Sequence, residues 1–290
     1  MTVTRISSYT TQQIASLSTT DLQSVSANDF SELLASQLEA LSTTQVGSLT
    51  APQVSVLSVS QMLDFSAAQF HALAAQQLAA VSATDIGALT TAQLSQIAYT
   101  EMSQLSATQL GALTPTQIGL FTTTQVKGLS TDQIASLSTT QIGGLSATQL
   151  GALGTLAQAF SATQIAALFT TQLKGLSRTE VSAFDTTQFG ALSSTQVVAL
   201  SPAQLGGLTS GDVAGLSVTL LGVLTSTQFA GLSVTAIPGL DDHQVAALDP
   251  VQLLGFSGAQ MAALTTTAID GLTVPQLAAL TPGQIAGLNR

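Results

Sequence analysis

An eight-residue period runs through the whole sequence and sets narrow limits on the fold. Large apolar residues fall at Met1, at Tyr9 and then at every eighth residue to Leu153. One seven-residue step reaches Phe160, and the spacing of eight then continues to Leu288. Each unit has a large apolar anchor (position 0), Ser or Thr (position 1), two variable residues, usually Gln (position 4), then Ile, Leu or Val (position 5) and two small residues. Because such repeats build solenoids or arrays, the period predicts a repeat architecture.

One continuous helix does not fit this period. At about 100° per residue, eight residues advance about 800°, so successive anchors would drift by about 80° per unit and spread around the helix axis. A continuous strand would place positions 0 and 5 on opposite faces and leave Ser and Gln without a role.

One short helix per unit gives each recurrent position a role. Ser138 at position 1 is a typical N-cap, and Gln141 at position 4 completes a capping box. Leu137 and Ile142, at positions 0 and 5, form the two members of a hydrophobic staple. Glycines at positions 6 and 7, such as Gly144, are expected to end the helix and to let the next segment pass closely.

Proline placement supports this interpretation independently. Six of the seven prolines lie in the predicted first turn, where a helix tolerates a missing N–H. They are Pro52, Pro115, Pro202, Pro250, Pro275 and Pro282. Pro238 lies at position 6, so we expect a local distortion there.

Other units depart from the pattern. Leu34, Ala74 and Ala98 stand at position 1, where the helix is expected to run on, so that residues 70–81 could form one longer helix. The seven-residue unit lacks both the cap and the Gln, and it predicts a kink or phase shift at residues 153–160. We otherwise expect one solenoid spanning residues 1–290.

The predicted fold is therefore all-α, a solenoid of short helices with a continuous spine of Leu, Ile and Phe. Helices this short are unstable alone, so stacking of positions 0 and 5 must stabilise them. The alternative is a β-solenoid with two octads per coil, which the Thr and Val content favours and the placement of Pro and Gly opposes.

Composition excludes several classes of function. Charged residues are 7% of the chain, against about 25% in typical soluble proteins, so we expect hydroxyls and amides to cover the surface. With net charge −10 and five Lys and Arg, binding to nucleic acid or to an anionic membrane is not expected. The lack of Cys excludes thiol chemistry. The sequence contains neither a stretch typical of a membrane-spanning helix nor an N-terminal signal peptide.

The densest polar cluster is Asp241, Asp242 and His243, with Asp249 one unit later. These residues could be imagined as metal ligands, but Asp241 and Asp249 occupy N-cap positions and Asp242 lies in a first turn, so we interpret them as capping residues. His71 is a lone surface histidine. A nucleophile, base and orienting group set apart from the repeat are missing. The sequence therefore predicts no catalytic, cofactor-binding or metal-binding residue and no enzyme.

Two resemblances bear on function. The phrases LTPTQIGL, LSPAQLGG and LTPGQIAG resemble the opening of a repeat in the DNA-reading effectors of plant-associated bacteria. Those repeats are four times longer and their surface is basic, so we do not transfer their function. The acidic, Cys-free, Thr/Ser/Gln/Ala-rich composition resembles the repeat regions of large bacterial proteins exported to the cell surface. This second resemblance implies an extracellular spacer, stalk or matrix protein.

We therefore expect a non-enzymatic structural protein, extracellular or at the cell surface, that forms a rod, a stalk or a self-assembling filament. Its first and last units show no recognisably polar capping unit, so the expected partners are a second copy stacked end to end or flanking repeats of a longer chain. The alternative is a solenoid binding module whose Ser/Thr/Gln face recognises a protein, a glycan or an ordered surface.

Overall fold

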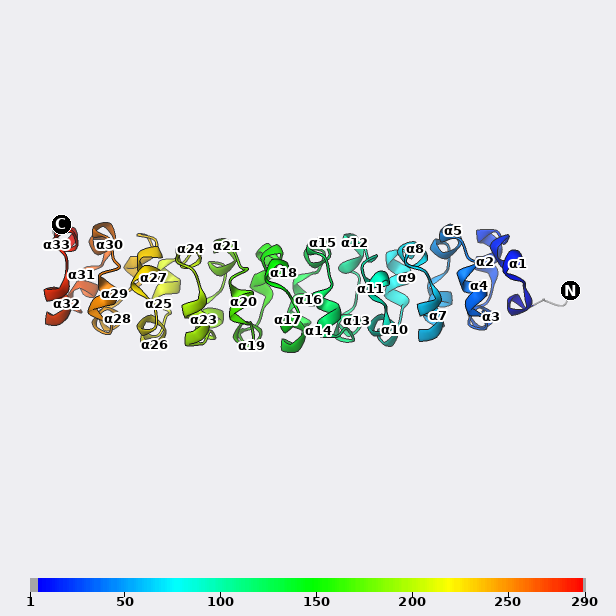
Figure 1. The fold of residues 1–290 in the computed structure, drawn as a ribbon, viewed down its shortest axis with the longest axis horizontal. Helices are drawn as coiled ribbons and strands as arrows, with labels where there is room; N and C mark the ends of the chain where they lie inside the picture. The colour runs from blue at the N-terminus through cyan, green and yellow to red at the C-terminus, as the bar shows by residue number, and fades with distance from the viewer. Residues whose placement is uncertain (1–4, 289–290) are drawn as a thin grey trace. The chain divides into compact units, whose positions relative to one another are not determined.

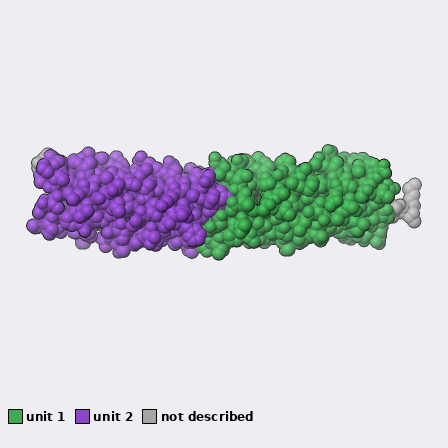
Figure 2. Space-filling model, viewed as in Figure 1, with its two compact units in different colours: residues 1–144 green, residues 145–290 purple. Residues whose placement is uncertain are grey.

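The structure is a computed structural model that describes residues 5–288, and no strand occurs among these residues. Short helices follow one another at intervals of one repeat (Figure 1). The chain divides into two compact units, unit 1 (residues 1–144) and unit 2 (residues 145–290), coloured separately in Figure 2. Each unit by itself is a helical solenoid. The predicted all-α solenoid is confirmed, and the β-solenoid alternative is wrong for the described residues.

The helices of unit 1 are η1 (Ile6–Ser8), α1 (Thr11–Ala15), α2 (Thr19–Ser24), α3 (Ala27–Phe30), α4 (Ala35–Glu39), α5 (Thr43–Gly47), α6 (Ala51–Ser55), α7 (Val59–Asp64), α8 (Ala67–His71), α9 (Ala75–Ala80), α10 (Ala83–Ala88), α11 (Thr91–Leu94), α12 (Tyr99–Met102), α13 (Ala107–Gly111), α14 (Pro115–Gly119), α15 (Thr123–Lys127), α16 (Thr131–Ser136) and α17 (Thr139–Gly143).

The helices of unit 2 are α18 (Ala147–Ala152), η2 (Gly154–Ala159), α19 (Ala162–Ala166), α20 (Thr170–Leu173), α21 (Arg178–Val181), α22 (Thr186–Gly190), α23 (Ser194–Ala199), α24 (Pro202–Leu205), α25 (Ser210–Ala214), α26 (Val218–Gly222), α27 (Ser226–Gly231), η3 (Ile237–Gly239), α28 (Asp242–Ala246), α29 (Pro250–Leu253), α30 (Gly258–Ala263), α31 (Thr266–Asp270), α32 (Val274–Ala279) and α33 (Pro282–Leu288). The labels η mark 3₁₀ helices.

Most α-helices begin directly after a Ser or Thr at position 1. In α17, the Ser138 hydroxyl accepts the backbone N–H of Gln141 at 3.2 Å, and Gln141 Oε1 accepts the backbone N–H of Ser138 at 3.0 Å. The same reciprocal pair recurs at the start of many other helices in both units. The predicted capping box is confirmed, and it satisfies two of the N–H groups that a helix start leaves without an intrahelical partner.

The core of each unit is the predicted spine. Position 5 is fully buried at Ile142, with 0% of its surface exposed, and the anchor Leu145 is 2% exposed. The same two positions supply nearly all the other buried apolar side chains, and in unit 2 the rings of Phe229 and Phe256 stack at 5.3 Å between centroids. Burial of this spine stabilises helices of four to seven residues that would not persist alone.

Each turn of the solenoid, which we call a coil, takes more than three and fewer than four eight-residue repeats. A Cβ placed on Gly87 would lie 2.8 Å from the carbonyl oxygen of Ala112, 25 residues later. A Cβ on Gly207 would lie 2.7 Å from the carbonyl oxygen of Arg178, 29 residues earlier. Three repeats are 24 residues and four are 32, so equivalent residues of successive coils do not stack directly on one another.

The glycines at positions 6 and 7 act mainly by permitting this close approach. Gly144 at the C-cap of α17 has a φ of −75°, which is ordinary helical backbone. Among the described residues only Gly154 has a positive φ, 57°. Apart from α18, whose C-cap Leu153 is followed by the left-handed Gly154, the described helices therefore end without left-handed glycine caps, whereas the predicted close passage of neighbouring segments is confirmed.

The predicted longer helix over residues 70–81 is wrong. The chain ends α8 at His71 and starts α9 at Ala75, although Ala74 offers no capping oxygen. Gln77 still accepts the backbone N–H of Ala74 at 2.6 Å. The glutamine half of the box is therefore sufficient to restart the helix where the hydroxyl half is missing.

Three of the described helices are 3₁₀ helices in place of α-helices, namely η1, η2 and η3. The distortion predicted at Pro238 is confirmed, since the eight-residue repeat that contains this proline forms only the short η3. The seven-residue unit forms η2, which begins at the left-handed Gly154. Whether the segments that flank residues 153–160 are shifted in phase stays a prediction. Among the described residues, no helix has the length and apolar character needed to span a membrane.

Candidate functional site

The glutamine at position 4 is buried in most repeats. Every buried glutamine among the described residues occupies this position, and Gln109, for example, is 3% exposed. This finding corrects the expectation that amides as well as hydroxyls cover the surface. A buried amide loses its hydrogen bonds to water, so it is tolerated only where protein groups replace them.

Each such amide links two coils. Gln109 Oε1 accepts the backbone N–H of Ser106 at 2.8 Å, which is the capping bond. Its Nε2 donates to the carbonyl oxygens of Leu78 at 3.0 Å and Val81 at 2.7 Å, 31 and 28 residues earlier. These carbonyls lie at the end of α9, where a helix leaves its last carbonyl groups without intrahelical N–H partners. One side chain therefore caps the start of its own helix and the end of a helix in the preceding coil.

The same arrangement recurs in both units, and we call it the glutamine ladder. In unit 2, Gln228 Nε2 donates to the carbonyl oxygens of Val197 at 3.0 Å and Leu200 at 2.9 Å. The described rungs with two such bonds include Gln45, Gln53, Gln69, Gln77, Gln93, Gln125, Gln133, Gln141, Gln196, Gln204, Gln244, Gln252, Gln260, Gln276 and Gln284.

The ladder determines how each coil aligns with the coil before it. Among the described residues, no buried side-chain nitrogen or oxygen lacks a hydrogen-bond partner. Leaving one such amide unpaired would cost about 1–3 kcal/mol, which is a large penalty against any shift in register. The apolar spine supplies most of the stabilisation, and the ladder selects the coil-on-coil alignment.

One rung of the ladder is reversed. Glu180 occupies position 4 in unit 2 and is 2% exposed. Its Oε1 accepts the backbone N–H of Gly154 at 2.9 Å, and its Oε2 accepts that of Ser177. The left-handed Gly154 turns an N–H toward this position, where other rungs find a carbonyl oxygen. The carboxylate therefore matches the altered backbone of the seven-residue unit, because it offers two acceptors and no donor.

Replacing Glu180 with glutamine is expected to destabilise unit 2 by about 1–3 kcal/mol, although glutamine is the usual residue at this position. The amide has only one oxygen, so either Gly154 or Ser177 would face an NH₂ group with its N–H unpaired. Urea unfolding followed by helical circular dichroism measures the loss. An unchanged or increased stability would show that Gly154 does not select the carboxylate.

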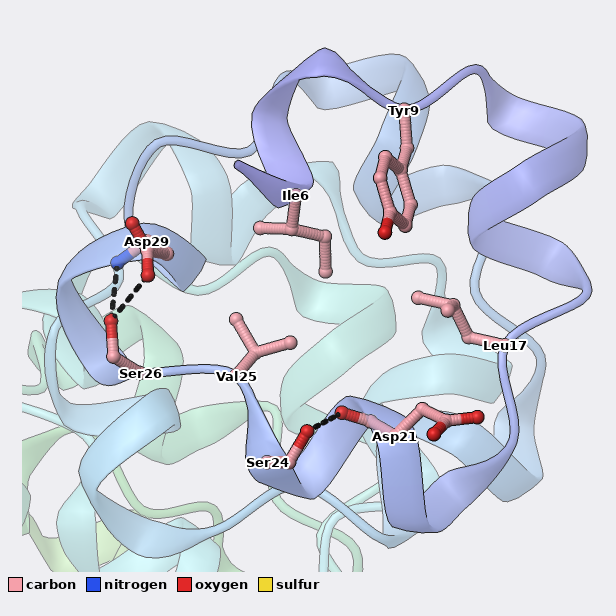
Figure 3. Close-up of a pocket in the computed structure, with 8 residues that line it drawn as sticks. All are labelled: Ile6, Tyr9, Leu17, Asp21, Ser24, Val25, Ser26 and Asp29. Atoms are coloured by element: carbon pink, nitrogen blue, oxygen red, sulfur yellow. Dashed lines mark hydrogen bonds between the residues drawn. The ribbon is translucent and has the colours of Figure 1, made fainter. Parts of the chain in front are cut away.

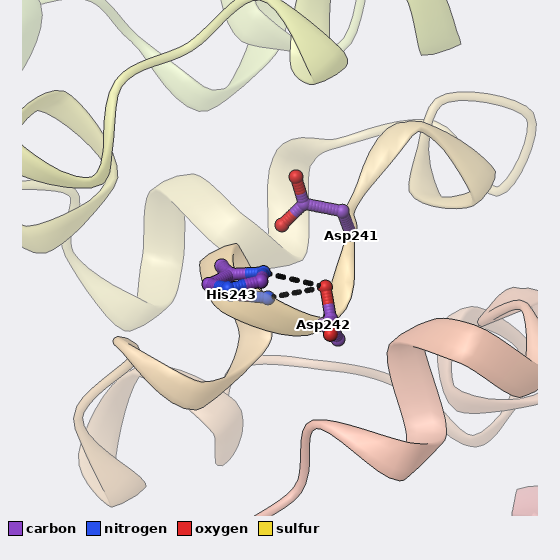
Figure 4. A group of neighbouring side chains, drawn as sticks. All are labelled: Asp241, Asp242 and His243. Carbon is purple, nitrogen blue, oxygen red and sulfur yellow. Dashed lines mark hydrogen bonds and ion pairs between the residues drawn. The ribbon is translucent and has the colours of Figure 1, made fainter.

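The cluster predicted at Asp241, Asp242 and His243 is a helix start (Figure 4). Asp241 Oδ1 accepts the backbone N–H of Gln244 at 2.7 Å, so its predicted capping role is confirmed. Asp242 Oδ1 accepts from His243, whose Nδ1 lies 2.8 Å away. One potential ligand atom from each of the three residues lies within 4.8 Å of the others. That no metal binds here stays a prediction.

The remaining candidates lie apart. Asp249 caps α29, where its Oδ1 accepts the backbone N–H of Val251 at 2.8 Å. His71, in unit 1, is exposed, and its Nδ1 lies 3.0 Å from the carbonyl oxygen of Gln96. The structure therefore brings together only the three adjacent residues of the α28 start.

The contact between Asp242 and His243 predicts a measurable titration. The hydrogen bond and charge of Asp242 raise the pKa of His243 above its ordinary 6.5, and the same hydrogen bond lowers the pKa of Asp242. We expect the Asp242→Asn variant to return the His243 pKa toward 6.5, as followed by NMR of the ring protons. The interaction is therefore present between the two pKa values: it is lost as pH rises through the raised pKa of His243 and as pH falls through the lowered pKa of Asp242. Both groups face solvent, so stability should hardly change. An identical titration in wild type and variant would contradict the contact.

Comparison with known proteins finds a repeat family. The model of the ALTTAQ repeat matches residues 122–155, 181–218 and 255–289, which is over a third of the chain. The phrase ALTTAQ itself stands at residues 88–93, where it contains an anchor, an N-cap and a ladder glutamine. No curated protein matches the chain. The repeat character is therefore supported both by the family model and by the structure.

Proposed function

We propose that the protein is a non-enzymatic structural protein, placed outside the cell or on its surface, in which the solenoid serves as a rod or stalk. The observation that carries the proposal is the glutamine ladder together with the buried spine. The same coil-on-coil contact is repeated through each unit, so added repeats extend the solenoid without requiring a new kind of interaction.

The ladder suits a chain that bears tension. In unit 1, separating two coils at the Gln109 rung would break the bonds to Leu78 and Val81 and expose the apolar spine beneath them. Each further separation would break an equivalent set of bonds. Resistance is thus distributed along the chain, as a spacer or stalk requires.

The chemistry of the polar groups supports a non-catalytic role. The recurrent Ser and Thr side chains cap helices, and the recurrent Gln side chains are buried in the ladder. An outside location is supported by the five Lys and Arg, which leave few sites for trypsin-like proteases. The alternative of a Ser/Thr/Gln binding face loses most of its amides, because the ladder glutamines are not available to a ligand.

Single-molecule stretching of the full chain tests the proposal. With handles at both ends, we expect a rising series of small unfolding steps as groups of coils separate, and refolding on relaxation because each contact is local. A chain that extends at negligible force, or that unfolds once without recovery, would rule out the stalk.

A further inference from the structure

The N-terminal coil, residues 5–33, has a hollow of about 370 Å³ lined by both apolar and polar side chains (Figure 3). The side chains of Ile6, Tyr9, Leu17 and Val25 line it. The last three are anchors, and they are only half-buried here, whereas the next anchors, such as Leu41 at 3% exposure, are covered. This hollow is the part of the spine that a preceding coil would cover.

The residues at position 4 differ in this coil. From position 37 to position 141, twelve of the fourteen residues at position 4 are glutamine. In the N-terminal coil only Gln13 is, and Asp21 and Asp29 hold the next two places. Both aspartates also line the hollow. The side chains that elsewhere donate to a preceding coil are here replaced by acceptors.

Each aspartate keeps the capping function while removing the donor. The Ser18 hydroxyl lies 2.6 Å from Asp21 Oδ2, and the Ser26 hydroxyl lies 2.7 Å from Asp29 Oδ2. The backbone N–H of each aspartate in turn donates to that serine. A coil that approached this face would place the carbonyl oxygens of its helix ends against carboxylate oxygens. Both kinds of oxygen are negative and neither offers a proton, so they would repel each other and lose their hydrogen bonds to water without replacement.

The complementary face belongs to the C-terminal coil. Leu277 and Ile285 stand at position 5, which is buried almost everywhere else, yet they are 45% and 46% exposed. This face has the same composition as those that receive the next coil inside each unit. By continuity with that interface, the occupant that would fit the N-terminal hollow is the C-terminal coil of a second copy.

We propose that Asp21 and Asp29 prevent a second copy of this chain from stacking its C-terminal coil on the N-terminal coil. Isolated acidic rungs are tolerated inside unit 1, where Asp85, 5% exposed, and Glu101 are each flanked by glutamine rungs. Chain connectivity holds those coils in place. A second copy has no such tether and must also overcome the entropy of association, so two adjacent repulsive rungs are decisive. The inference rests on the coil-on-coil contact of the proposed function and limits it to single chains.

Sedimentation velocity of the full chain over a wide concentration range tests the inference. The wild type is expected to remain monomeric. The variant Asp21→Gln/Asp29→Gln restores two rungs and is expected to raise the end-to-end association constant at least about a hundredfold, since each rung adds hydrogen bonds worth roughly a factor of ten. Electron microscopy should then show chains of monomers joined end to end.

Two controls define the outcome. Glu39→Gln/Asp132→Gln makes the same change in charge at exposed sites outside the ladder and should stay monomeric. Adding Leu277→Glu to the associating variant should abolish the chains.

If circular dichroism shows that the two glutamine substitutions impair folding, the variant Asp21→Asn/Asp29→Asn supplies the amide donors on side chains of the original length. The inference is overturned if the folded variants sediment like the wild type, if the charge control associates equally, or if the wild type already stacks. Stretching of monomers remains a separate test of the stalk.

Discussion

Replacing Gln109 with glutamate is expected to destabilise unit 1 by about 3 kcal/mol or more. The substitution keeps the length of the side chain and the oxygen that accepts the backbone N–H of Ser106. It removes the donor to Leu78 and Val81 and places a carboxylate against their carbonyl oxygens. A buried charge without a donor partner is among the most costly single changes in a protein core. Urea unfolding monitored by circular dichroism measures the free energy of unfolding.

The matched control is Gln13→Glu. Gln13 occupies the same position in the N-terminal coil, where its side chain is exposed and its Oε1 accepts from the backbone N–H and the hydroxyl of Thr10. A surface change of this kind is expected to alter stability by about 0.5 kcal/mol or less. Equal effects of the two substitutions would mean that the ladder does not contribute to stability beyond helix capping.

Replacing Gly231 with alanine is expected to destabilise unit 2 by about 1–3 kcal/mol. A Cβ on Gly231 would lie 2.5 Å, 2.6 Å and 2.7 Å from the carbonyl oxygen, Cβ and Cα of Pro202 in the neighbouring coil. These distances are far inside van der Waals contact, and the proline ring and backbone cannot move aside as a flexible side chain would. The two coils would have to separate locally.

Gly222→Ala is the control for this substitution. Gly222 also ends a helix, α26, but a Cβ there would meet nothing within 4 Å. Because alanine is the better helix former, we expect a small gain of about 0.5–1 kcal/mol. Thermal unfolding of both variants gives the comparison. Similar melting temperatures for the two would contradict the close passage at Gly231.

The local structure could be predicted because its signals lie within one repeat. A capping box is a relation between residues three apart, as in Ser138 and Gln141, and the position of proline reports directly on the first turn. The buried spine followed from positions 0 and 5 for the same reason. The run-on expected at Ala74 was wrong because it treated the hydroxyl as essential, whereas Gln77 alone restarts the helix.

The contacts between coils could not be predicted from the same signals. The capping box uses only the oxygen of the glutamine amide, and the partners of its nitrogen depend on the number of repeats per turn. The sequence offers no local measure of that number. Without it, nothing in the sequence distinguishes Glu180, Asp21 or Asp29 from any other acidic residue in the first turn of a helix.

The fractional number of repeats per turn has a consequence for how the gene can change. Each ladder glutamine donates to carbonyl oxygens 28 and 31 residues earlier in the chain. Removing eight codons from a regular stretch would therefore give each glutamine new carbonyl partners at the same positions of another repeat, equivalent to the old ones. Removing one codon would shift every later rung, and the chain compensates its single seven-residue unit with Gly154 and Glu180 together. The length of the protein is therefore free to vary in whole octads, whereas a lost residue needs a second mutation about one turn away.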